Sequence, residues 1–158
     1  MIKIGESIPN TTLKVMGAEG PQEVETQELF ENKKVVLFSV PGAFTPTCSA
    51  AHLPGFVVQS DAIKAKGVDS IVCMSVNDVF VMDAWGKSQN AEQIIMLADG
   101  NADFTEAMGL GLDATAWGMG AVRSKRFALI ANDGVVEALE IDEKGLDKSS
   151  AEHILSLL

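Results

Sequence analysis

The stretch KKVVLFSVPGAFTPTCSA, residues 33–50, joins a run of β-branched and apolar residues to a segment rich in proline and threonine. Its first part, residues 33–40, is apolar enough to form a central strand that is buried on both faces. Its second part begins with Pro41, which ends the strand, and leads to Cys48 at the start of a helical pattern. The stretch therefore predicts a strand, a tight loop and a helix that begins near the cysteine.

Strand and helix patterns alternate along the rest of the chain. Further buried strands are predicted at residues 69–76 and 94–98, and Asp133-Gly134 predicts a hairpin between two strands within residues 124–141. Helices are predicted at residues 47–66, 79–88, 102–109 and 150–157.

This order of elements predicts the fold class. Strands that alternate with helices and end in an antiparallel hairpin indicate an α/β fold with a central mixed β-sheet flanked by helices. The thioredoxin-like topology fits this order. Pro54 should kink the first long helix. No repeat or linker divides the sequence, so residues 1–158 are expected to form a single domain.

Charge and hydropathy exclude several kinds of partner. The chain has 12 basic and 22 acidic residues, a net charge of -10, which would repel a nucleic acid or an anionic membrane surface. No apolar run approaches the roughly 20 residues of a membrane span. The N-terminal residues MIKIGESIPN do not resemble a secretory signal, so a cytoplasmic location is expected.

The two cysteines, Cys48 and Cys73, are too few for a disulfide framework. The chain lacks CxxC and HxxxH patterns, so no metal site is expected. Residues 109–120 contain GLG but no complete phosphate-binding loop, and no cofactor is expected.

Cys48 stands where a thiolate is favoured, because the first turn of a helix has unpaired N–H groups and the positive end of the helix dipole. Pro46 restricts the backbone of Thr45, and Gly42 allows a ligand to approach the backbone closely. The Thr45 hydroxyl can reach the same place. A reactive site would also need a cation as a second donor.

The pattern Pro41-x-x-x-Thr45-x-x-Cys48, within PGAFTPTCSAAHLPGF, resembles the active-site signature of peroxiredoxins of the peroxiredoxin-5 (type II) subgroup. The early GESIPN, the KRF segment that contains Arg126 and the hairpin after it extend the resemblance over nearly the whole chain. It implies that Cys48 is the peroxidatic cysteine, that Thr45 hydrogen-bonds the peroxide and that Pro41 shields the thiolate. Arg126 would supply the cation.

The resemblance also bears on how the oxidised cysteine is reduced. Members of the subgroup that resolve internally carry a cysteine after a Gly-Leu pair near the C-terminus, and EKGLDKSSAEHILSLL has none. A one-cysteine enzyme is therefore expected, with hydrogen peroxide and small organic hydroperoxides as substrates. Glutathione, with or without glutaredoxin, is the expected reductant, and thioredoxin is an alternative. Cys73, in a buried strand, is expected to pack in the core. A homodimer is expected.

Other residues leave alternatives open. His52 lies about one helical turn after Cys48 and is interpreted as a structural hydrogen-bonding residue rather than a base. Arg123 supports Arg126 or pairs with a surface acid. Gly42, Phe44, Trp85 and Met119 are candidates for the substrate pocket, and packing in the core or at the surface is an equal alternative for Phe44 and Trp85. Two rival functions are a non-enzymatic thiol redox sensor and a disulfide exchanger that pairs Cys48 with Cys73.

Overall fold

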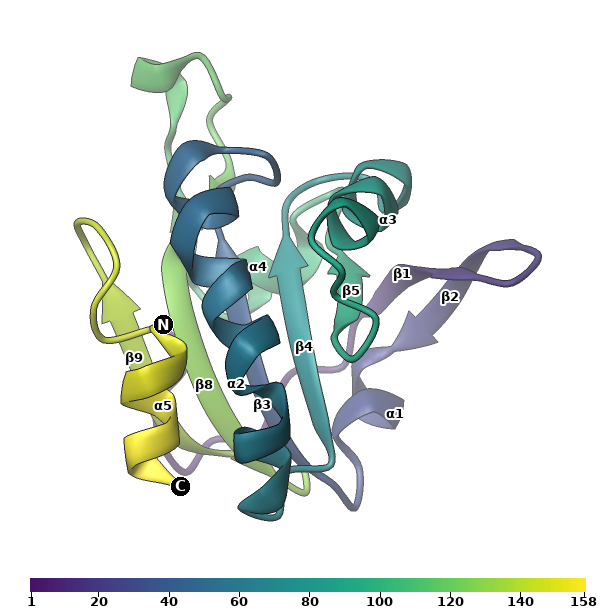
Figure 1. Cartoon of the computed structure of the whole chain (residues 1–158). Coiled ribbons are helices and arrows are strands. Elements are labelled where there is room, and N and C mark those ends of the chain that lie inside the picture. Colours follow the sequence, from purple (N-terminus) through teal and green to yellow (C-terminus); the bar gives the residue numbers. More distant parts are fainter.

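A seven-stranded mixed sheet forms the centre of the protein in the computed structural model, which describes all residues from 1 to 158 (Figure 1). Its strands are β1 (Thr12–Gly17), β2 (Gly20–Glu25), β3 (Lys34–Val40), β4 (Ser70–Ser75), β5 (Ile95–Ala98), β8 (Arg126–Asn132) and β9 (Val135–Asp142). Their order across the sheet is β2-β1-β5-β4-β3-β8-β9.

The middle of the sheet is parallel and its outer strands are antiparallel. β3 pairs in parallel with β4, and β4 with β5, whereas β8 runs antiparallel to β3. Every residue of β3 after Lys34 is buried, as the apolar run predicted. Asp133 and Gly134 join β8 to β9 with φ values of 49° and 76°, the positive values that a type I′ hairpin turn requires.

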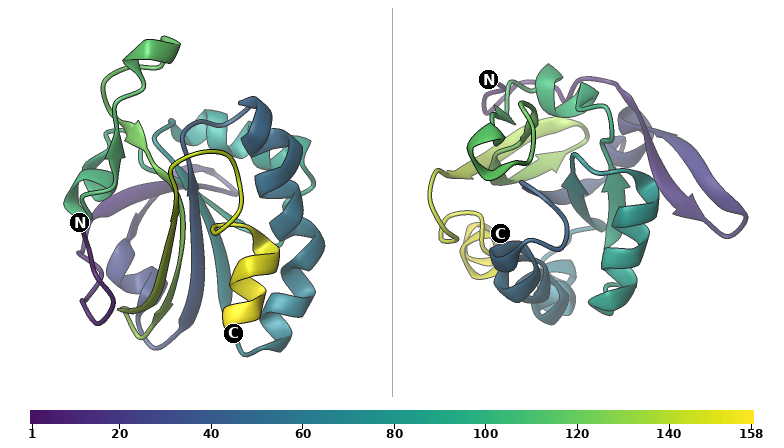
Figure 2. Two further views of the ribbon diagram at one scale, coloured as in Figure 1. Left: turned by 90° about the vertical axis from the view of Figure 1, so that its left-hand side faces the viewer. Right: turned by 90° about the horizontal axis from the view of Figure 1, so that it is seen from above.

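Helices cover both faces of the sheet, as Figures 1 and 2 show. α2 (Leu53–Ala65), α3 (Val79–Ser88) and α5 (Ala151–Leu157) pack through Phe56, Met82 and Ile154 on one face. α1 (Thr26–Phe30) and α4 (Asp103–Ala107) pack through Phe30 and Phe104 on the other. These three layers confirm the predicted thioredoxin-like fold. None of the helices has the length and apolar composition that crossing a membrane requires.

Two features of the fold differ from the sequence predictions. The N-terminal hairpin of β1 and β2 was not predicted, because its residues are largely exposed or half-buried and show no clear apolar alternation. The irregular winding expected at Pro54 lies earlier, at Cys48–His52, which form a π-helical segment. There the Leu53 N–H donates to the Cys48 carbonyl, five residues back. Pro54 lies in the first turn of α2, where its missing N–H is tolerated.

Candidate active site

Cys48 lies at the end of the sheet where β3 finishes. Pro41 to Thr47 form a tight loop, and the Ser49 N–H donates to the Thr45 carbonyl at 2.9 Å, so helical winding has begun at the cysteine. The Cys48 side chain is fully buried, and its own N–H has no backbone acceptor. An unpaired N–H at a helix start can stabilise negative charge on the sulfur or on a bound oxygen.

Arg126 reaches this sulfur from the first residue of β8. Because β8 runs antiparallel to β3, the start of β8 lies beside the end of β3, where Ser39 is opposite Phe127. Arg126 Nη2 donates to Cys48 Sγ at 3.1 Å, although the two residues are 78 positions apart in the chain. The structure thus brings together the thiol and the cation that were predicted to share one site.

Thr45 and Gly42 form the other side of the loop. The Thr45 hydroxyl donates to the Gly42 carbonyl at 2.7 Å rather than to the Cys48 sulfur. A Cβ on Gly42 would lie 2.8 Å from Met119 Cε and 3.1 Å from Thr45 Cγ2. Gly42 therefore permits the close packing of the Met119 side chain over this loop.

His52 is held in one protonation state and one tautomer. Its Nε2 lies 2.9 Å from the Ser149 carbonyl, which only accepts, and its Nδ1 lies 2.8 Å from Arg126 Nη1, which only donates. The proton is therefore on Nε2. Burial, followed by the charge of Arg126, lowers the pKa of His52 to about 3, against the opposing effects of the Ser149 hydrogen bond and Asp142. A neutral imidazole is consistent with the hydrogen-bonding interpretation of this residue.

This protonation state predicts how stability depends on pH. The unfolded chain binds a proton at His52 below pH 6.5, whereas the folded chain does so only near pH 3, so stability falls as the pH drops from 6.5 towards 3. Between pH 7 and pH 5 the loss should be about 2 kcal/mol of unfolding free energy. Urea unfolding at the two pH values measures it.

The second histidine provides the matched control for this measurement. His153 lies at the surface, with its side chain 38% exposed and Nε2 3.7 Å from a Glu140 oxygen. His52→Asn should remove most of the stability difference between pH 7 and pH 5, and His153→Asn should retain it. An unchanged difference in His52→Asn would show that another group causes the acid destabilisation.

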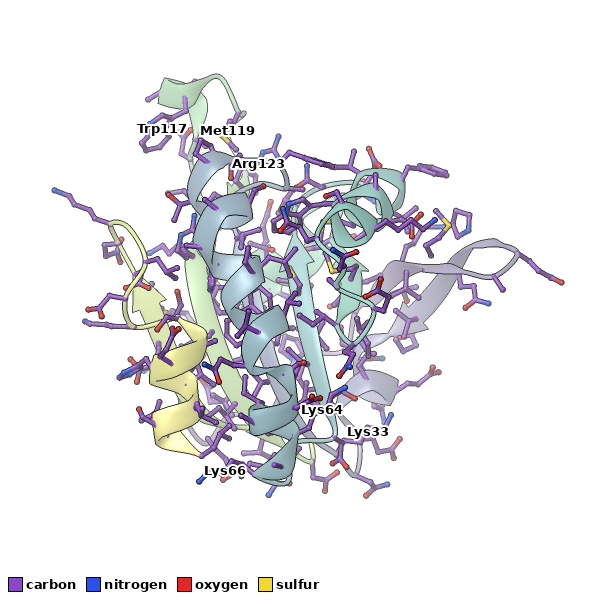
Figure 3. The ribbon with its side chains drawn as sticks, viewed as in Figure 1. Lys33, Lys64, Lys66, Trp117, Met119 and Arg123 are labelled. Carbon is purple, nitrogen blue, oxygen red and sulfur yellow. The ribbon has the colours of Figure 1, made fainter.

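A groove of about 500 Å³ opens in front of Thr45 and Arg126. The strands β6 (Gly111–Leu112) and β7 (Arg123–Ser124) carry the loop that forms one part of its wall. Figure 3 shows Trp117 and Met119 of this loop at the end of the molecule where the π-helical segment and α2 begin. The lining residues include Pro41, Thr45, Leu112, Trp117, Met119, Lys125, Arg126 and Lys144.

Two of the four candidate pocket residues lie at the groove and two do not. Met119 lines the groove, and Gly42 lies directly beneath Met119. Trp85 does not line the groove: it is fully buried, and its indole N–H donates to Ser49 Oγ at 3.0 Å. Phe44 does not line it either. Its backbone has a φ of 64°, and its side chain is 55% exposed at the surface outside the groove. For Trp85 and Phe44 the structure favours the alternatives, core packing for Trp85 and surface packing for Phe44.

Arg123 holds the groove loop and does not contact the sulfur. Its Nε donates to the Met119 carbonyl at 2.8 Å and its Nη1 to the Val76 carbonyl at 2.9 Å. It thereby connects the loop to the end of β4, near Gly42. Arg123 supports the site through the backbone, while Arg126 alone of the two supplies the cation at Cys48.

Cys73 has the character of a core residue. It is fully buried in β4, opposite Phe38 of β3, and both cysteines are free thiols. Burial, and to a lesser degree the neighbouring Cys48, raises the pKa of the Cys73 thiol well above its usual range. A protonated, inaccessible thiol is a poor nucleophile.

These contacts define a class of protein. A disulfide exchanger of thioredoxin fold uses a second thiol three residues before the first, and here that position holds Thr45. A single buried sulfur beside a guanidinium is suited instead to attack on a small polar oxidant whose negative charge develops during the reaction. The fold and the site together define a thiol peroxidase of thioredoxin-like fold.

Comparisons with known proteins identify the family. The Redoxin family matches residues 3–155. "Peroxiredoxin-2E-2, chloroplastic" of Oryza sativa subsp. japonica is 47% identical over 163 residues, which cover 99% of this chain and 72% of the rice protein. "Peroxiredoxin-2E, chloroplastic" of Arabidopsis thaliana is 43% identical over 162 residues, covering 99% and 69%. The reduced Prx3 of Vibrio vulnificus in complex with hydrogen peroxide has a TM-score of 0.96 at 54% identity, with 99% of both chains covered. This chain belongs to the peroxiredoxins, in the type II group, and is a thiol-dependent peroxidase.

The same comparisons correct one prediction. The N-terminal sequence led us to expect a cytoplasmic protein, but two of the similar plant peroxiredoxins are named as chloroplastic. The residues MIKIGESIPN therefore do not indicate the cytoplasm for this chain.

Proposed function

We propose that this peroxiredoxin reduces hydrogen peroxide and small organic hydroperoxides with Cys48 as its peroxidatic cysteine, and that an external thiol regenerates the enzyme. The observation that carries the proposal is the 3.1 Å contact between Arg126 Nη2 and Cys48 Sγ. It puts a permanent positive charge beside a buried sulfur at a helix start, where a thiolate and the negative charge of a leaving oxygen are both stabilised.

The first half-reaction is a displacement at one peroxide oxygen. The thiolate of Cys48 donates an electron pair to that oxygen, the S–O bond forms and the O–O bond breaks. The second oxygen leaves with the bonding pair and takes up a proton, giving water from hydrogen peroxide or an alcohol from an organic hydroperoxide. Sulfur is oxidised to a sulfenic acid and the peroxide is reduced by two electrons. The Arg126 guanidinium and the Cys48 N–H stabilise charge on the two oxygens.

Thr45 and Pro41 complete this site. Because the Thr45 hydroxyl directs its own proton to the Gly42 carbonyl, its oxygen is ready to accept a hydrogen bond from the peroxide O–H. Donation to the peroxide would first require the hydroxyl to turn. Pro41 lines the groove, and its apolar ring limits the access of water to the sulfur.

The size of the groove supports more than one substrate. Hydrogen peroxide has two oxygens and needs about 60 Å³, twice the volume of a water molecule in the liquid. The groove of about 500 Å³ leaves room for the organic part of a small hydroperoxide beside Leu112 and Met119. The Vibrio relative, whose structure contains hydrogen peroxide, supports the smaller substrate.

The second half-reaction needs a thiol from outside the chain. A first thiol attacks the sulfenic acid, releasing water and forming a mixed disulfide; a second thiol then releases Cys48 and leaves as the oxidised disulfide. Glutathione, with or without glutaredoxin, is the proposed donor, and thioredoxin is the alternative. Because the Cys48 side chain is fully buried, the π-helical segment must open for this step. Single π turns within helices are frequent at functional sites.

Steady-state turnover tests the proposed reductant. We expect continuous loss of hydrogen peroxide with glutathione and glutaredoxin, and the same rate in Cys73→Ser, because Cys73 takes no part in either step. Peroxide loss is followed with glutathione alone, with glutaredoxin added, and with thioredoxin and its reductase. Turnover with thioredoxin only would reject glutathione as the donor. A Cys73→Ser protein that loses turnover would reject the one-cysteine cycle.

We propose that the protein forms a homodimer and that its interface lies at the carboxyl ends of the parallel strands. Three aromatic side chains are largely exposed there: Phe44 by 55%, Phe80 by 64% and Trp117 by 70%. Exposed aromatic side chains of this kind are typical of a surface that a partner covers. Phe44 follows β3 and Phe80 follows β4, so both lie at the sheet edge that holds Cys48. Sedimentation equilibrium tests this proposal, and a monomeric mass at high micromolar concentration would contradict it.

A further inference from the structure

The carboxylate closest to Arg126 in the sheet register is not its partner. Asp142 is opposite Arg126 on the adjacent strand β9, where the two side chains share one face of the sheet. Yet the carboxylate of Asp142 accepts from the N–H groups of Asp147, Lys148 and Ser149 at 3.0, 3.0 and 2.9 Å and from Ser149 Oγ at 2.7 Å. These four donors fasten the loop between β9 and α5 onto Asp142 and occupy its oxygens.

The same loop holds His52. The carbonyl of Ser149 accepts from His52 Nε2, and this fixes Nδ1 as the acceptor for Arg126 Nη1. The imidazole is fully buried between Phe38 and Phe56, with ring centroids 5.0 and 5.7 Å away, so it cannot easily turn. A chain of hydrogen bonds therefore runs from the loop through His52 to the guanidinium.

We propose that His52 is a positioning residue, which orients the Arg126 guanidinium towards Cys48 without adding a negative charge of its own, and that the Asp142–Ser149 loop fixes His52 for this task. The proposal rests on the role proposed above for Arg126. A carboxylate in the place of His52 would orient the guanidinium equally well but would cancel the charge that the thiolate and the leaving oxygen require. A neutral acceptor separates orientation from charge compensation.

Three replacements of His52 separate these two effects. His52→Asn keeps a neutral acceptor near the position of Nδ1, His52→Asp puts a charged acceptor there, and His52→Leu removes the acceptor. The rate constant for Cys48 oxidation by hydrogen peroxide, measured by stopped flow, should fall about 10- to 100-fold in His52→Asp and His52→Leu. His52→Asn should recover most of that loss.

A second readout excludes a merely structural role. The pH midpoint for alkylation of Cys48 by iodoacetamide should move upward in both His52→Asp and His52→Leu. The first puts a negative charge beside the guanidinium, and the second leaves the guanidinium without the acceptor that fixes it. It should stay close to the original value in His52→Asn. Thermal melting of each protein shows that the folded state is being compared.

A variant at a residue that contacts neither Cys48 nor His52 keeps the proposal testable where a His52 variant folds poorly. Asp142→Asn loosens the loop and should lower the oxidation rate about 3- to 10-fold, and it should cause no further loss in the His52→Leu background, because both act through one chain of contacts. Equal rates and alkylation midpoints in His52→Asn, His52→Asp and His52→Leu would overturn the proposal. If Arg126→Ala itself leaves the oxidation rate unchanged, the proposed function of Arg126 fails first, and this outcome is distinguishable from failure of His52 alone.

Discussion

Cys48→Ser is expected to lose peroxidase activity almost completely, with peroxide consumption at least about 1,000-fold below that of the original protein. A serine hydroxyl in the same place can accept the Arg126 hydrogen bond, but it does not ionise at physiological pH and its oxygen attacks peroxides poorly. The substitution removes the thiolate, the nucleophile that opens the O–O bond. Peroxide consumption in the presence of excess thiol measures the loss.

The matched control for this substitution is Cys73→Ser. Both cysteines are fully buried, but only Cys48 is in contact with a guanidinium. Mass spectrometry after one equivalent of peroxide should show a single added oxygen on Cys48 in Cys73→Ser and none in Cys48→Ser. Full turnover in Cys48→Ser, together with loss of turnover in Cys73→Ser, would show that Cys73 and not Cys48 is the peroxidatic cysteine.

Arg126→Ala is expected to slow the reaction of Cys48 with hydrogen peroxide about 30- to 1,000-fold, corresponding to about 2 to 4 kcal/mol of barrier. The substitution removes the donor at 3.1 Å from Cys48 Sγ and the one permanent charge in contact with the sulfur. It also leaves the Nδ1 of His52 without its donor. The rate constant is measured by stopped flow with the thiol-reduced protein.

Two further substitutions show which property of Arg126 matters. Arg126→Lys keeps the charge but cannot bond His52 and Cys48 at once with a planar fork, so it should recover only part of the rate. Arg123→Ala removes the hydrogen bonds to the Met119 and Val76 carbonyls and should cost less than tenfold, since Arg123 does not contact the sulfur. A larger loss in Arg123→Ala than in Arg126→Ala would reverse the roles given to the two arginines.

The fold could be predicted largely because its central elements have strong local patterns. A few neighbouring residues suffice to predict the strand β3, from its continuous apolar run, and the Asp133-Gly134 turn. Both predictions are confirmed. The β1–β2 hairpin lacks such a pattern, since it lies at the edge of the sheet and is only partly buried. The π-helical segment was also missed, because the local pattern of residues does not distinguish a π turn from an α turn.

The site was predictable to a different degree for each residue. Pro41, Thr45 and Cys48 are close in the chain, so the sequence already indicates that they share one loop. Arg126 entered only through the resemblance to peroxiredoxins, and the antiparallel pairing of β3 with β8 supplies the physical reason for its place. For Trp85 both the groove and the core remained open, because an aromatic side chain in an amphipathic helix does not indicate which of the two it faces.

The sequence by itself determined the order of strands and helices, the tight loop after β3 and the placement of a cysteine at a helix start, since all of these depend on neighbouring residues. Only the tertiary structure decided the electrostatics of the site. Burial and the charge of Arg126 keep His52 neutral, and the loop that binds Asp142 withholds that carboxylate from the guanidinium. These effects arise because residues distant in the chain are brought into a space without water, where hydrogen-bond partners and nearby charges set protonation and charge.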